Sequence, residues 1–523
     1  MSKLLHQSLT DSAEKYPDRD AFRYGMDSIT YAELLEKASR LANALIEARV
    51  SRGDRVGILI NTSIDSAVAL YGILLAGAAY VPIDPASPPA RIRFLIEDCD
   101  LNVLVSAEDQ HSLILDSLSK EVEIECVIGV ENELPCRQMA WSEVDAFKSE
   151  APTVSIVEDD LAYIMYTSGT TGLPKGIMHT HFSGMSYARL SRSLYEINEF
   201  DRLGNHSPLH FDISTLGFLT MPHSGGTTVI VPEAYKKFPV SLARLIEAEE
   251  LSIWYSVPLA LIQLLQRGML EEVNLGSLRW VLFGGESFDT EQLRKLIKLI
   301  PNARFSNVYG PAEVNQCTFY NFSALPRQVE EVPLGRAWDE TEIVLINEGG
   351  DLAGGKETGE ILVSTSTMMK GYWGSPDMTA KSLHTTEVNK VFYRTGDLAR
   401  RNEKGELVFQ GRRDRQIKTR GYRVEPAGVE LVLQRHELIV EAAVFGYEDK
   451  DGETSIKAAI VLREGATGLP ADLENFVSRS IPKYACPSKY LIVNELPRTG
   501  AGKVDYSLIK KQATGRYRFE AAN

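Results

Sequence analysis

Short apolar segments rich in β-branched residues alternate with helical patterns through the first half of the chain. Segment 55–60 has the length of a strand, and segment 66–75, which follows it, has the spacing of a helix. Repeated alternation of this kind is typical of α/β layers in which most strands are parallel. The other strand-like segments are 101–106, 127–130, 162–169, 227–232, 252–258 and 278–286.

The pattern changes after about residue 332, where short strand signals are separated by glycine turns. Segments 359–373 and 404–414 indicate an antiparallel, barrel-like subdomain, and a last αβ unit runs from about residue 415. A chain of 523 residues is too long for one ordinary core. We therefore predict an α/β protein with a large N-terminal domain of two layered mixed sheets, helices and a small β-barrel subdomain, followed by a small α+β C-terminal domain.

The chain is strongly acidic, with 56 Lys and Arg against 71 Asp and Glu and a formal net charge of −15. This charge argues against general binding to nucleic acid or to anionic membranes. From residue 415 onward, however, 17 basic residues face 14 acidic ones. The slightly basic end suits a small domain that meets anions, although ordinary variation of surface charge explains it equally well.

The cysteines and the N-terminus indicate a reducing, cytoplasmic location. None of the five cysteines stands in a CxxC pair or beside clustered histidines, so neither a zinc site nor a disulfide framework is expected. The first twenty residues contain no basic segment followed by an apolar core, and therefore do not form a signal peptide. Segment 67–83 is short and ends in Val-Pro-Ile, which favours a buried helix running into a strand over a membrane span.

A loop rich in small and hydroxyl residues, YTSGTTGLPKG at 166–176, follows an apolar strand signal. Its glycines let backbone N–H groups approach a polyphosphate, and its hydroxyls and Lys175 add donors and positive charge. The loop is not a Walker A motif, because Lys175 is followed by Gly176 and not by Ser or Thr. Alone it predicts only that the chain binds a nucleotide.

The complete string resembles the signature loop of the adenylate-forming superfamily, which includes acyl-CoA synthetases, luciferases and the adenylation domains of nonribosomal peptide synthetases. The resemblance extends over nearly the whole chain in order, and its early motifs are similar to those of the peptide-synthetase branch. The matching segments are ITYAEL (29–34), LAGAAYVPIDP (75–85), FDIS (211–214), NVYGPAE (307–313), GEILVSTSTMMKGYW (359–373), YRTGDL (393–398), GRRDRQIKTRGYRVE (411–425), IPKYACP (481–487) and AGKVD (501–505).

This resemblance implies an enzyme that uses ATP and Mg²⁺ to activate a carboxylic acid as an acyl-adenylate. Two anions meet in such a reaction and pyrophosphate leaves, so the site needs cations and hydrogen-bond donors. By motif position, Lys503 matches the catalytic lysine, Glu313 the magnesium-binding glutamate, and Thr167 a further catalytic position. Ala312 stands where the family usually has threonine, so one hydroxyl contact to phosphate is lacking.

The resemblance also assigns a nucleotide site. Asp397 would hold the ribose hydroxyls, Tyr309 would stack on adenine, and Arg412 would reach ribose or phosphate. A Tyr-Gly-Pro turn and a surface Arg–Asp ion pair are the plainer interpretations of the last two motifs. The predicted ATP-binding residues are Thr167, Ser168, Gly169, Thr170, Thr171, Gly172, Lys175, Gly285, Asn307, Val308, Tyr309, Gly310, Asp397, Arg412 and Lys503.

In the family the C-terminal domain is mobile and turns about a hinge residue, which Asp414 matches. The implied domains are therefore an adenylation core at 1–413 and a mobile C-terminal domain at 414–523. After the turn, Lys418, Arg420 and Gly421 would face the site while a thiol attacks the adenylate. Pro426 departs from the family pattern here and is expected to stiffen the chain.

Asp212 separates the branches of the superfamily, because an aspartate at this point pairs with the α-ammonium of an amino acid. Its plainer interpretation is a helix cap or a turn. The residues expected to line the pocket beside it carry no charge, which favours a small or medium apolar amino acid. By family position, the substrate-binding residues are Phe211, Asp212, Ile213, Leu216, Tyr255, Leu282, Gly284, Val308, Gln316 and Cys317.

Tyr255 and Cys317 favour L-proline, as in free-standing prolyl-AMP ligases. A glycine- or alanine-type pocket, a D-alanine carrier-protein ligase, and an acyl- or aryl-CoA ligase remain alternatives, and Gln316 fits none of these patterns. No carrier segment follows Lys503, so we expect the acceptor to be the phosphopantetheine thiol of a separate carrier protein. An inactive homologue that serves as a scaffold is the alternative outside the enzymes.

Overall fold

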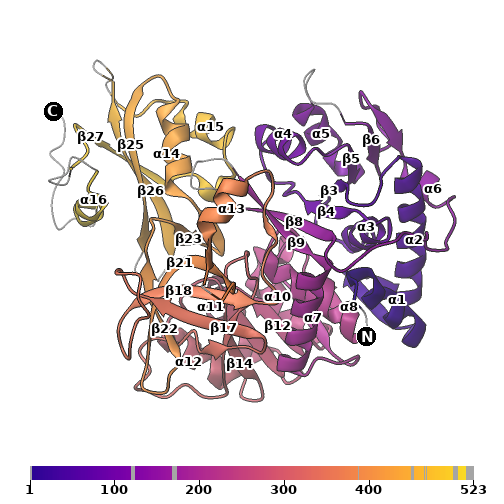
Figure 1. Ribbon diagram of the computed structural model, residues 1–523, viewed down its shortest axis with the longest axis horizontal. Helices are drawn as coiled ribbons and strands as arrows, with labels where there is room; N and C mark the ends of the chain where they lie inside the picture. The colour runs from indigo at the N-terminus through magenta and orange to yellow at the C-terminus, as the bar shows by residue number, and fades with distance from the viewer. Residues whose placement is uncertain are drawn as a thin grey trace. The chain divides into compact units, whose positions relative to one another are not determined.

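The computed structural model describes residues 3–118, 124–167, 174–386, 388–448, 453–463, 466, 468–498 and 504–513 (Figure 1). The chain forms two compact units. The larger contains residues 1–85, 96–165 and 176–413, and the smaller contains residues 86–95, 166–175 and 414–523. The main boundary between the two units therefore falls between Arg413 and Asp414. Two short earlier segments, 86–95 and 166–175, also belong to the smaller unit.

One sheet has eight strands in the order β19-β9-β8-β4-β3-β5-β6-β7. The neighbours from β8 to β7 are parallel, as the alternating pattern predicts, and β19 is antiparallel to β9. The strands are β3 (Arg55–Leu59), β4 (Ala79–Pro82), β5 (Val103–Ser106), β6 (Cys126–Ile128), β7 (Arg137–Met139), β8 (Leu161–Thr167), β9 (Lys175–Thr180) and β19 (Gly371–Tyr372).

A second sheet has nine strands in the order β16-β15-β14-β13-β12-β10-β11-β1-β2. Its six central strands are parallel, and β2, β15 and β16 pair antiparallel at the edges. The strands are β1 (Asp20–Tyr24), β2 (Asp27–Thr30), β10 (Arg202–Asn205), β11 (Thr227–Ile230), β12 (Ile253–Ser256), β13 (Trp280–Gly284), β14 (Arg304–Tyr309), β15 (Thr318–Phe322) and β16 (Arg336–Ala337).

Helices cover these sheets through apolar faces. Helix α2 begins at a capping box in which Thr30 and Glu33 satisfy each other's backbone N–H groups. Helix α3 is buried from Ser66 to Leu75 and leads into β4, so the predicted buried helix and strand at 67–83 are confirmed. The helices of the first half are α1 (Leu5–Lys15), α2 (Tyr31–Glu47), α3 (Ile64–Leu75), α4 (Pro89–Asp98), α5 (His111–Ser117), α6 (Trp141–Val144), α7 (His181–Tyr195) and α8 (Met221–Ser224).

The remaining helices of the larger unit belong mainly to the nine-stranded sheet. Apolar residues of α10, α11 and α12 pack on β11 to β14 in one core cluster (Figure 1). No helix in the described part of the chain is long and apolar enough to cross a membrane. The bounds are α9 (Glu233–Lys236), α10 (Pro239–Ala248), α11 (Pro258–Arg267), α12 (Thr290–Leu299) and α13 (Pro376–Ser382), with 3₁₀ turns η1 (Glu108–Gln110), η2 (Asp212–Ser214) and η4 (Leu270–Glu272) and the π-helical turn η3 (Leu216–Thr220).

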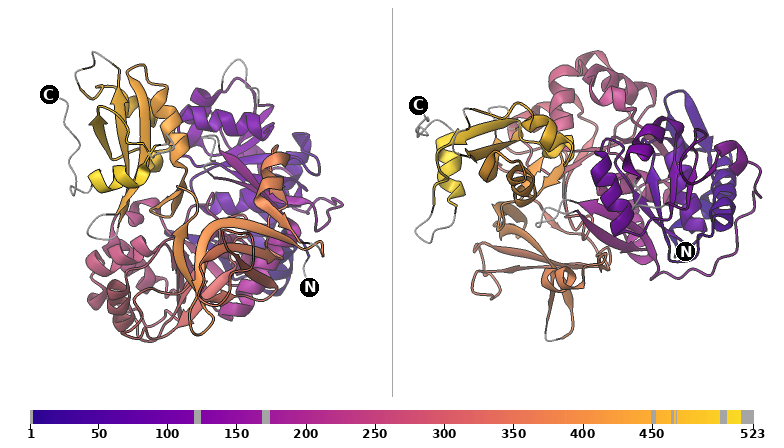
Figure 2. Two further views of the ribbon diagram at one scale, coloured as in Figure 1. Left: turned by 60° about the vertical axis from the view of Figure 1, so that its left-hand side comes forward. Right: turned by 90° about the horizontal axis from the view of Figure 1, so that it is seen from above.

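A third, curved sheet of five antiparallel strands follows, where the sequence predicts the barrel-like subdomain (Figure 2). The long strand β21 pairs with β18, β20 and β22, and β18 pairs with β17. The pairing of β21 with β22 places Asp397 opposite Arg412. The strands are β17 (Thr341–Ile346), β18 (Gly359–Thr365), β20 (Leu383–Thr385), β21 (Val391–Arg401) and β22 (Leu407–Arg412).

After Asp414 the smaller unit has its own α+β core, in which α14 and α15 pack on a three-stranded sheet. Pro426 is the first residue of α14, a position where the missing N–H of proline costs nothing. The elements are β23 (Ile417–Thr419), β24 (Tyr422–Val424), α14 (Pro426–Gln434), β25 (Ile439–Glu448), β26 (Thr454–Leu462), α15 (Leu473–Ser478), η5 (Lys483–Ala485), β27 (Lys489–Val493) and α16 (Tyr506–Ala513).

Candidate active site

Several predicted nucleotide residues lie at the carboxyl ends of two neighbouring parallel strands. Gly284 ends β13 and pairs with Val308 of β14, and Asn307 and Tyr309 flank Val308. Ligands of α/β sheets commonly bind beyond this edge. Gly285, directly after β13, has φ +90°, a left-handed conformation that favours glycine.

Gly310 lets the chain fold back closely after β14. A Cβ atom at this position would lie 1.7 Å from the carbonyl oxygen of Asn315 and 2.9 Å from Cα of Gln316. No side chain fits there without moving the backbone. The turn therefore fixes Gln316 beside the end of the strand that carries Tyr309.

Asp397 is the centre of a buried polar group that we call the Asp397 cluster: Tyr309, Asp397 and Arg412. The hydroxyl of Tyr309 donates to Asp397 Oδ2 at 2.7 Å, and the guanidinium of Arg412 forms an ion pair with Oδ1. Asp397 is only 1% exposed. Burial, followed by the Asp397 charge, raises the pKa of Tyr309, so its hydroxyl stays protonated and donates. Arg412 is therefore not part of a surface ion pair.

Glu313 is buried and held by two neighbours from one segment. Its carboxylate accepts a hydrogen bond of 2.8 Å from the Tyr372 hydroxyl, and its carbonyl accepts one of 2.8 Å from the backbone N–H of Met369. Among the described residues no three Asp, Glu, His or Cys side chains gather around a metal position. One carboxylate nevertheless fits Mg²⁺, which usually keeps several waters and binds substrate phosphates.

His179 holds the backbone next to Glu313, a contact that sequence reasoning did not foresee. Its Nε2 lies 2.9 Å from the carbonyl oxygen of Ala312 and its Nδ1 lies 3.2 Å from the Ser183 hydroxyl. Because a carbonyl only accepts, Nε2 carries the proton and donates. Burial lowers the pKa of His179 to about 4, so the ring is neutral at physiological pH.

Asp212 opens a short 3₁₀ turn, η2, which the π-helical turn η3 follows after Thr215. Its Oδ1 accepts a hydrogen bond of 2.9 Å from the backbone N–H of Ile213. Phe211, which is half-buried, precedes the turn, and its ring lies 5.1 Å from that of His210. Such irregular helical turns occur frequently at functional sites.

Half of the ten predicted pocket residues come together in one buried group, the Tyr255 cluster. Tyr255 of β12 pairs with Leu282 of β13, which places both side chains on the same face of the parallel sheet. Cys317 lies elsewhere: it packs with Tyr309, and its thiol donates to the Tyr309 carbonyl at 3.5 Å. Members of the Tyr255 cluster used below are Tyr195, Leu216, Tyr255, Leu282 and Val308, with Ile213 packed against them.

Two buried tyrosines of α7, Tyr187 and Tyr195, were not predicted, and Tyr195 belongs to the Tyr255 cluster. Burial, followed by the neighbouring Tyr187, Asp212 and Tyr195, raises the pKa of Tyr255. The Tyr195 hydroxyl accepts a hydrogen bond of 2.8 Å from Gln316 Nε2. Tyrosines on a helix carry no functional signal in the sequence, so only the folded chain shows that Tyr195 packs with Tyr255 and Leu282.

The other predicted residues lie apart from these clusters. Thr167 ends β8 and Lys175 begins β9, whereas Ser168, Gly169, Thr170, Thr171, Gly172 and Lys503 lie outside the described residues. In the smaller unit, Lys418 lies on β23, and Arg420 and Gly421 form the turn to β24. Asp414 Oδ1 accepts a hydrogen bond of 3.2 Å from the backbone N–H of Gln416.

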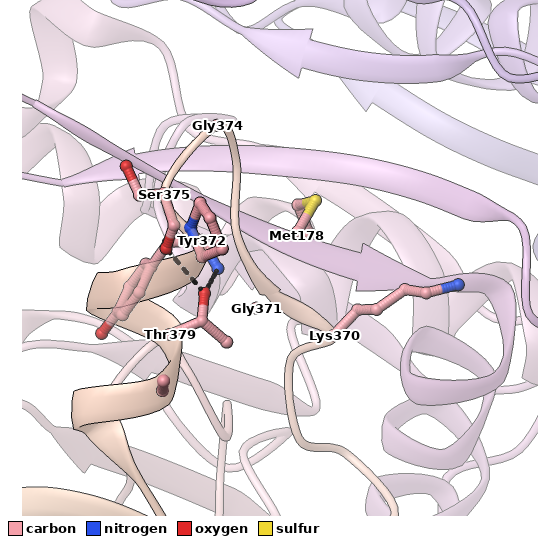
Figure 3. Close-up of a pocket in the computed structure, with 9 residues that line it drawn as sticks. Met178, Lys370, Gly371, Tyr372, Gly374, Ser375 and Thr379 are labelled. Carbon is pink, nitrogen blue, oxygen red and sulfur yellow. Dashed lines mark hydrogen bonds between the residues drawn. The ribbon is translucent and has the colours of Figure 1, made fainter.

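A surface pocket of about 380 Å³ opens beside β9 and β19 (Figure 3). The Tyr372 backbone N–H donates to the Thr379 hydroxyl at 2.9 Å beneath it. None of the predicted site residues lines this pocket. Its lining residues are Met178, Lys370, Gly371, Tyr372, Gly374, Ser375, Pro376, Thr379 and Ala380.

Comparison with known families agrees with this arrangement. The family described as AMP-binding enzyme matches residues 9–373, and the AMP-binding enzyme C-terminal domain matches residues 428–503. The chain therefore belongs to the AMP-binding enzyme family, and the resemblance to the adenylate-forming superfamily is confirmed.

Similar proteins cover the chain almost completely. It is 32% identical to an L-proline–[L-prolyl-carrier protein] ligase of Pseudomonas fluorescens, covering 98% of this chain and 100% of the relative. It is 30% identical to a ligase of the same name from Streptomyces coelicolor, covering 97% and 96% of the two chains. Among solved structures, the amide bond synthetase McbA of Marinactinospora thermotolerans matches with a TM-score of 0.87 at 24% identity, over 97% of this chain and 99% of that one. The structural similarity to this synthetase establishes the fold of the chain.

Proposed function

We propose that this enzyme is an amino acid–[carrier protein] ligase whose first candidate substrate is L-proline. The observation that carries the proposal is Asp212, placed beside the buried, uncharged Tyr255 cluster. A carboxylate facing such surroundings favours a cation as its partner. The α-ammonium of an amino acid supplies that cation, whereas a fatty or aryl acid does not. The two relatives named as L-proline ligases support the same choice.

In the proposed reaction, a carboxylate oxygen of the amino acid attacks the α-phosphorus of ATP. The bond from that phosphorus to the bridging oxygen breaks, and pyrophosphate leaves with the electron pair. Mg²⁺ would offset the phosphate charge, with Glu313 as its protein ligand. Lys503 would lie between the carboxylate and the α-phosphate, and the loop from Thr167 to Lys175 would hold the departing phosphates.

The nucleoside would lie at the carboxyl ends of β13 and β14. Asp397 already accepts bonds from Tyr309 and Arg412, and a carboxylate with two oxygens retains lone pairs for ribose hydroxyls. Gly285 allows close approach of the adenine to the backbone. Asn307 donates its amide to the Pro333 carbonyl at 2.8 Å and so is held at the strand end.

For the second half-reaction we propose a turn of the C-terminal domain at Asp414. Lys418, Arg420 and Gly421 would then face the adenylate. The thiol of a phosphopantetheine arm on a separate carrier protein attacks the acyl carbon, a thioester forms, and AMP leaves. Arg420 has φ +53° and Gly421 has φ +80°, so the tight turn between β23 and β24 presents this segment.

Amino-acid-dependent exchange of pyrophosphate into ATP tests the first half-reaction. We expect exchange with L-proline above that with glycine, alanine, valine and D-alanine, and none with aryl or fatty acids. Lys503→Ala should abolish exchange while ATP binding persists; unchanged exchange in this variant would exclude the proposed mechanism. Exchange supported by aryl or fatty acids but by no amino acid would establish an acyl- or aryl-CoA ligase instead.

Transfer is tested by incubating the enzyme with ATP, the activated amino acid and a phosphopantetheinylated carrier protein. We expect a thioester on the carrier, detected as a mass increase of the intact protein, and none on a carrier that lacks the arm. Replacement of the carrier by coenzyme A should give little product. A preference for coenzyme A would overturn the assignment of the acceptor.

A further inference from the structure

Gln316 is a buried amide with one end unsatisfied. Gln316 is only 2% exposed, and its side-chain Nε2 donates a hydrogen bond of 2.8 Å to the Tyr195 hydroxyl. Its Oε1 has no hydrogen-bond donor among the described residues. If the amide is turned by half a revolution, Oε1 accepts from the Tyr195 hydroxyl and the NH₂ group takes the former place of Oε1. In the assigned orientation one polar atom is buried without a partner, which is unfavourable.

The surroundings hold this amide where it is. The Tyr195 carbonyl accepts hydrogen bonds from Arg279 at 2.8 Å and from Trp280 Nε1 at 3.0 Å, which fixes the end of α7. On the other side, the turn at Gly310 packs against the backbone of Gln316. The unpaired end therefore cannot find a partner through a simple shift of its neighbours.

The amide borders the residues proposed to bind the amino-acid side chain. Tyr195, its hydrogen-bond partner, packs in the same cluster as Leu216, Tyr255 and Leu282. The hydroxyl of Tyr195 also lies 3.4 Å from the Ser306 hydroxyl, and Ser306 pairs with Leu282 in the sheet. A purely apolar substrate would pack on the leucines and leave the amide unpaired.

We propose that the preferred amino acid, of about the size of proline, carries a hydroxyl group on its side chain or ring and that this hydroxyl bonds to the amide of Gln316. A hydroxyl both donates and accepts, so it satisfies either orientation of the amide. This inference rests on the proposed function and refines its substrate. A pocket that contains a hydrogen-bonding group rejects analogues that lack the matching group more strongly than an apolar pocket rejects an added hydroxyl.

Matched pairs of substrates that differ by one hydroxyl test the proposal in the exchange assay. The pairs are L-proline with its 3- and 4-hydroxylated forms, alanine with serine, and valine with threonine. We expect kcat/KM for the hydroxylated member to exceed that for the plain member by about 10-fold or more in at least one pair. If the plain member is preferred in every pair, the proposal is wrong.

Gln316→Met keeps the length of the side chain and removes its hydrogen-bonding groups. We expect this variant to lower exchange with the hydroxylated substrate and raise exchange with the plain one, so that their ratio falls about 10-fold or more. Gln328→Met is the matched control, because Gln328 is exposed and lies outside both clusters. An unchanged ratio in Gln316→Met would overturn the proposal.

Tyr195→Phe provides a second route if the first variant does not fold. This variant removes the hydroxyl that orients the amide and keeps the aromatic ring of residue 195 in the core. The ratio of exchange with the hydroxylated substrate to exchange with the plain one should therefore fall. A ratio equal to that of the wild type in this variant contradicts the proposal. The proposed function fails in a different way: no amino acid supports exchange, and the proposal then falls with it.

Discussion

The Asp397 cluster and the Tyr255 cluster are built in opposite ways. In the first, a buried carboxylate is satisfied by a tyrosine hydroxyl and a guanidinium; Asp397 and Arg412 lie on the paired strands β21 and β22, and Tyr309 lies on β14 of another sheet. In the second, apolar side chains of the neighbouring strands β12, β13 and β14 pack with Leu216 and Tyr195, and the amide of Gln316, bonded to Tyr195, keeps an unpaired end. The first arrangement is complete without a ligand, whereas the second still lacks a partner.

From this difference we infer separate roles for the two clusters, one in binding the nucleotide and one in selecting the amino acid. A nucleotide is the same in every turnover, so a rigid and fully bonded cluster can be ready for it. A pocket that must select one amino acid gains discrimination from groups that only the correct substrate satisfies. Three further variants test this difference between the two clusters, beginning with the one that should have the strongest effect.

Asp397→Ala should have the largest effect, because it removes the carboxylate that forms an ion pair with the buried Arg412 guanidinium. We expect a loss of about 3–5 kcal/mol of unfolding free energy, measured by chemical denaturation, together with weaker ATP binding. Asp159→Ala is the control, since Asp159 pairs with Lys370 at 2.7 Å and its side chain is 79% exposed. The control should lose no more than about 1 kcal/mol. Equal losses in the two variants would refute the picture of a preformed cluster.

Asp212→Asn should leave stability and ATP binding nearly intact and impair only the use of amino acids. We expect kcat/KM for the amino acid to fall about 100-fold in the exchange assay, because a neutral amide cannot compensate a desolvated ammonium. Measurement of KM for ATP in the same variant separates the two clusters. A comparable fall in affinity for ATP would show that the clusters are not independent.

His179→Gln should have the smallest effect at neutral pH and a visible one in acid. The pKa of His179 is lowered by burial to about 4, so its unfolded form binds a proton at higher pH than its folded form does. Its contribution to stability is therefore present above about pH 6.5 and decreases as the pH falls toward 4. The variant, which keeps a donor for Ala312, should lose about 2 kcal/mol less than the wild type between pH 7 and 5. Denaturant titrations at both pH values measure this, and identical losses would contradict it.

The sequence predicted the fold well where local signals repeat. The strand-like segments at 227–232, 252–258 and 278–286 became β11, β12 and β13, because β-branched residues and flanking helices report directly on buried parallel strands. The strand order was not predictable, since β10 inserts between β11 and β12 through contacts distant along the chain. The π-helical turn after Thr215 was also unforeseen, because local propensity does not specify it.

Prediction of the site residues likewise succeeded or failed according to whether a local motif or a contact between distant residues was needed. Tyr309 and Gly285 were assigned to the nucleotide site through the family resemblance alone, and the structure places them at the ends of the neighbouring strands β14 and β13. The contact of Gln316 with Tyr195 spans 121 positions, and that of His179 with Ala312 spans 133. Tyr195 and His179 lie outside the matching motifs, so only the folded chain shows that Ala312, where the family usually has threonine, lies next to a buried imidazole.

The close approach at Gly310 has a practical consequence for redesign. Because the backbone closes on itself there, the strand end that we propose binds the nucleotide and the residue that we propose contacts the amino acid are joined by a short, closely packed turn. Engineers who wish to change the accepted amino acid can exchange the side chain at 316 and leave the turn untouched. A substitution of Gly310, in contrast, would displace both the end of β14 and the backbone at Gln316, so a second change on one side alone would not restore the turn.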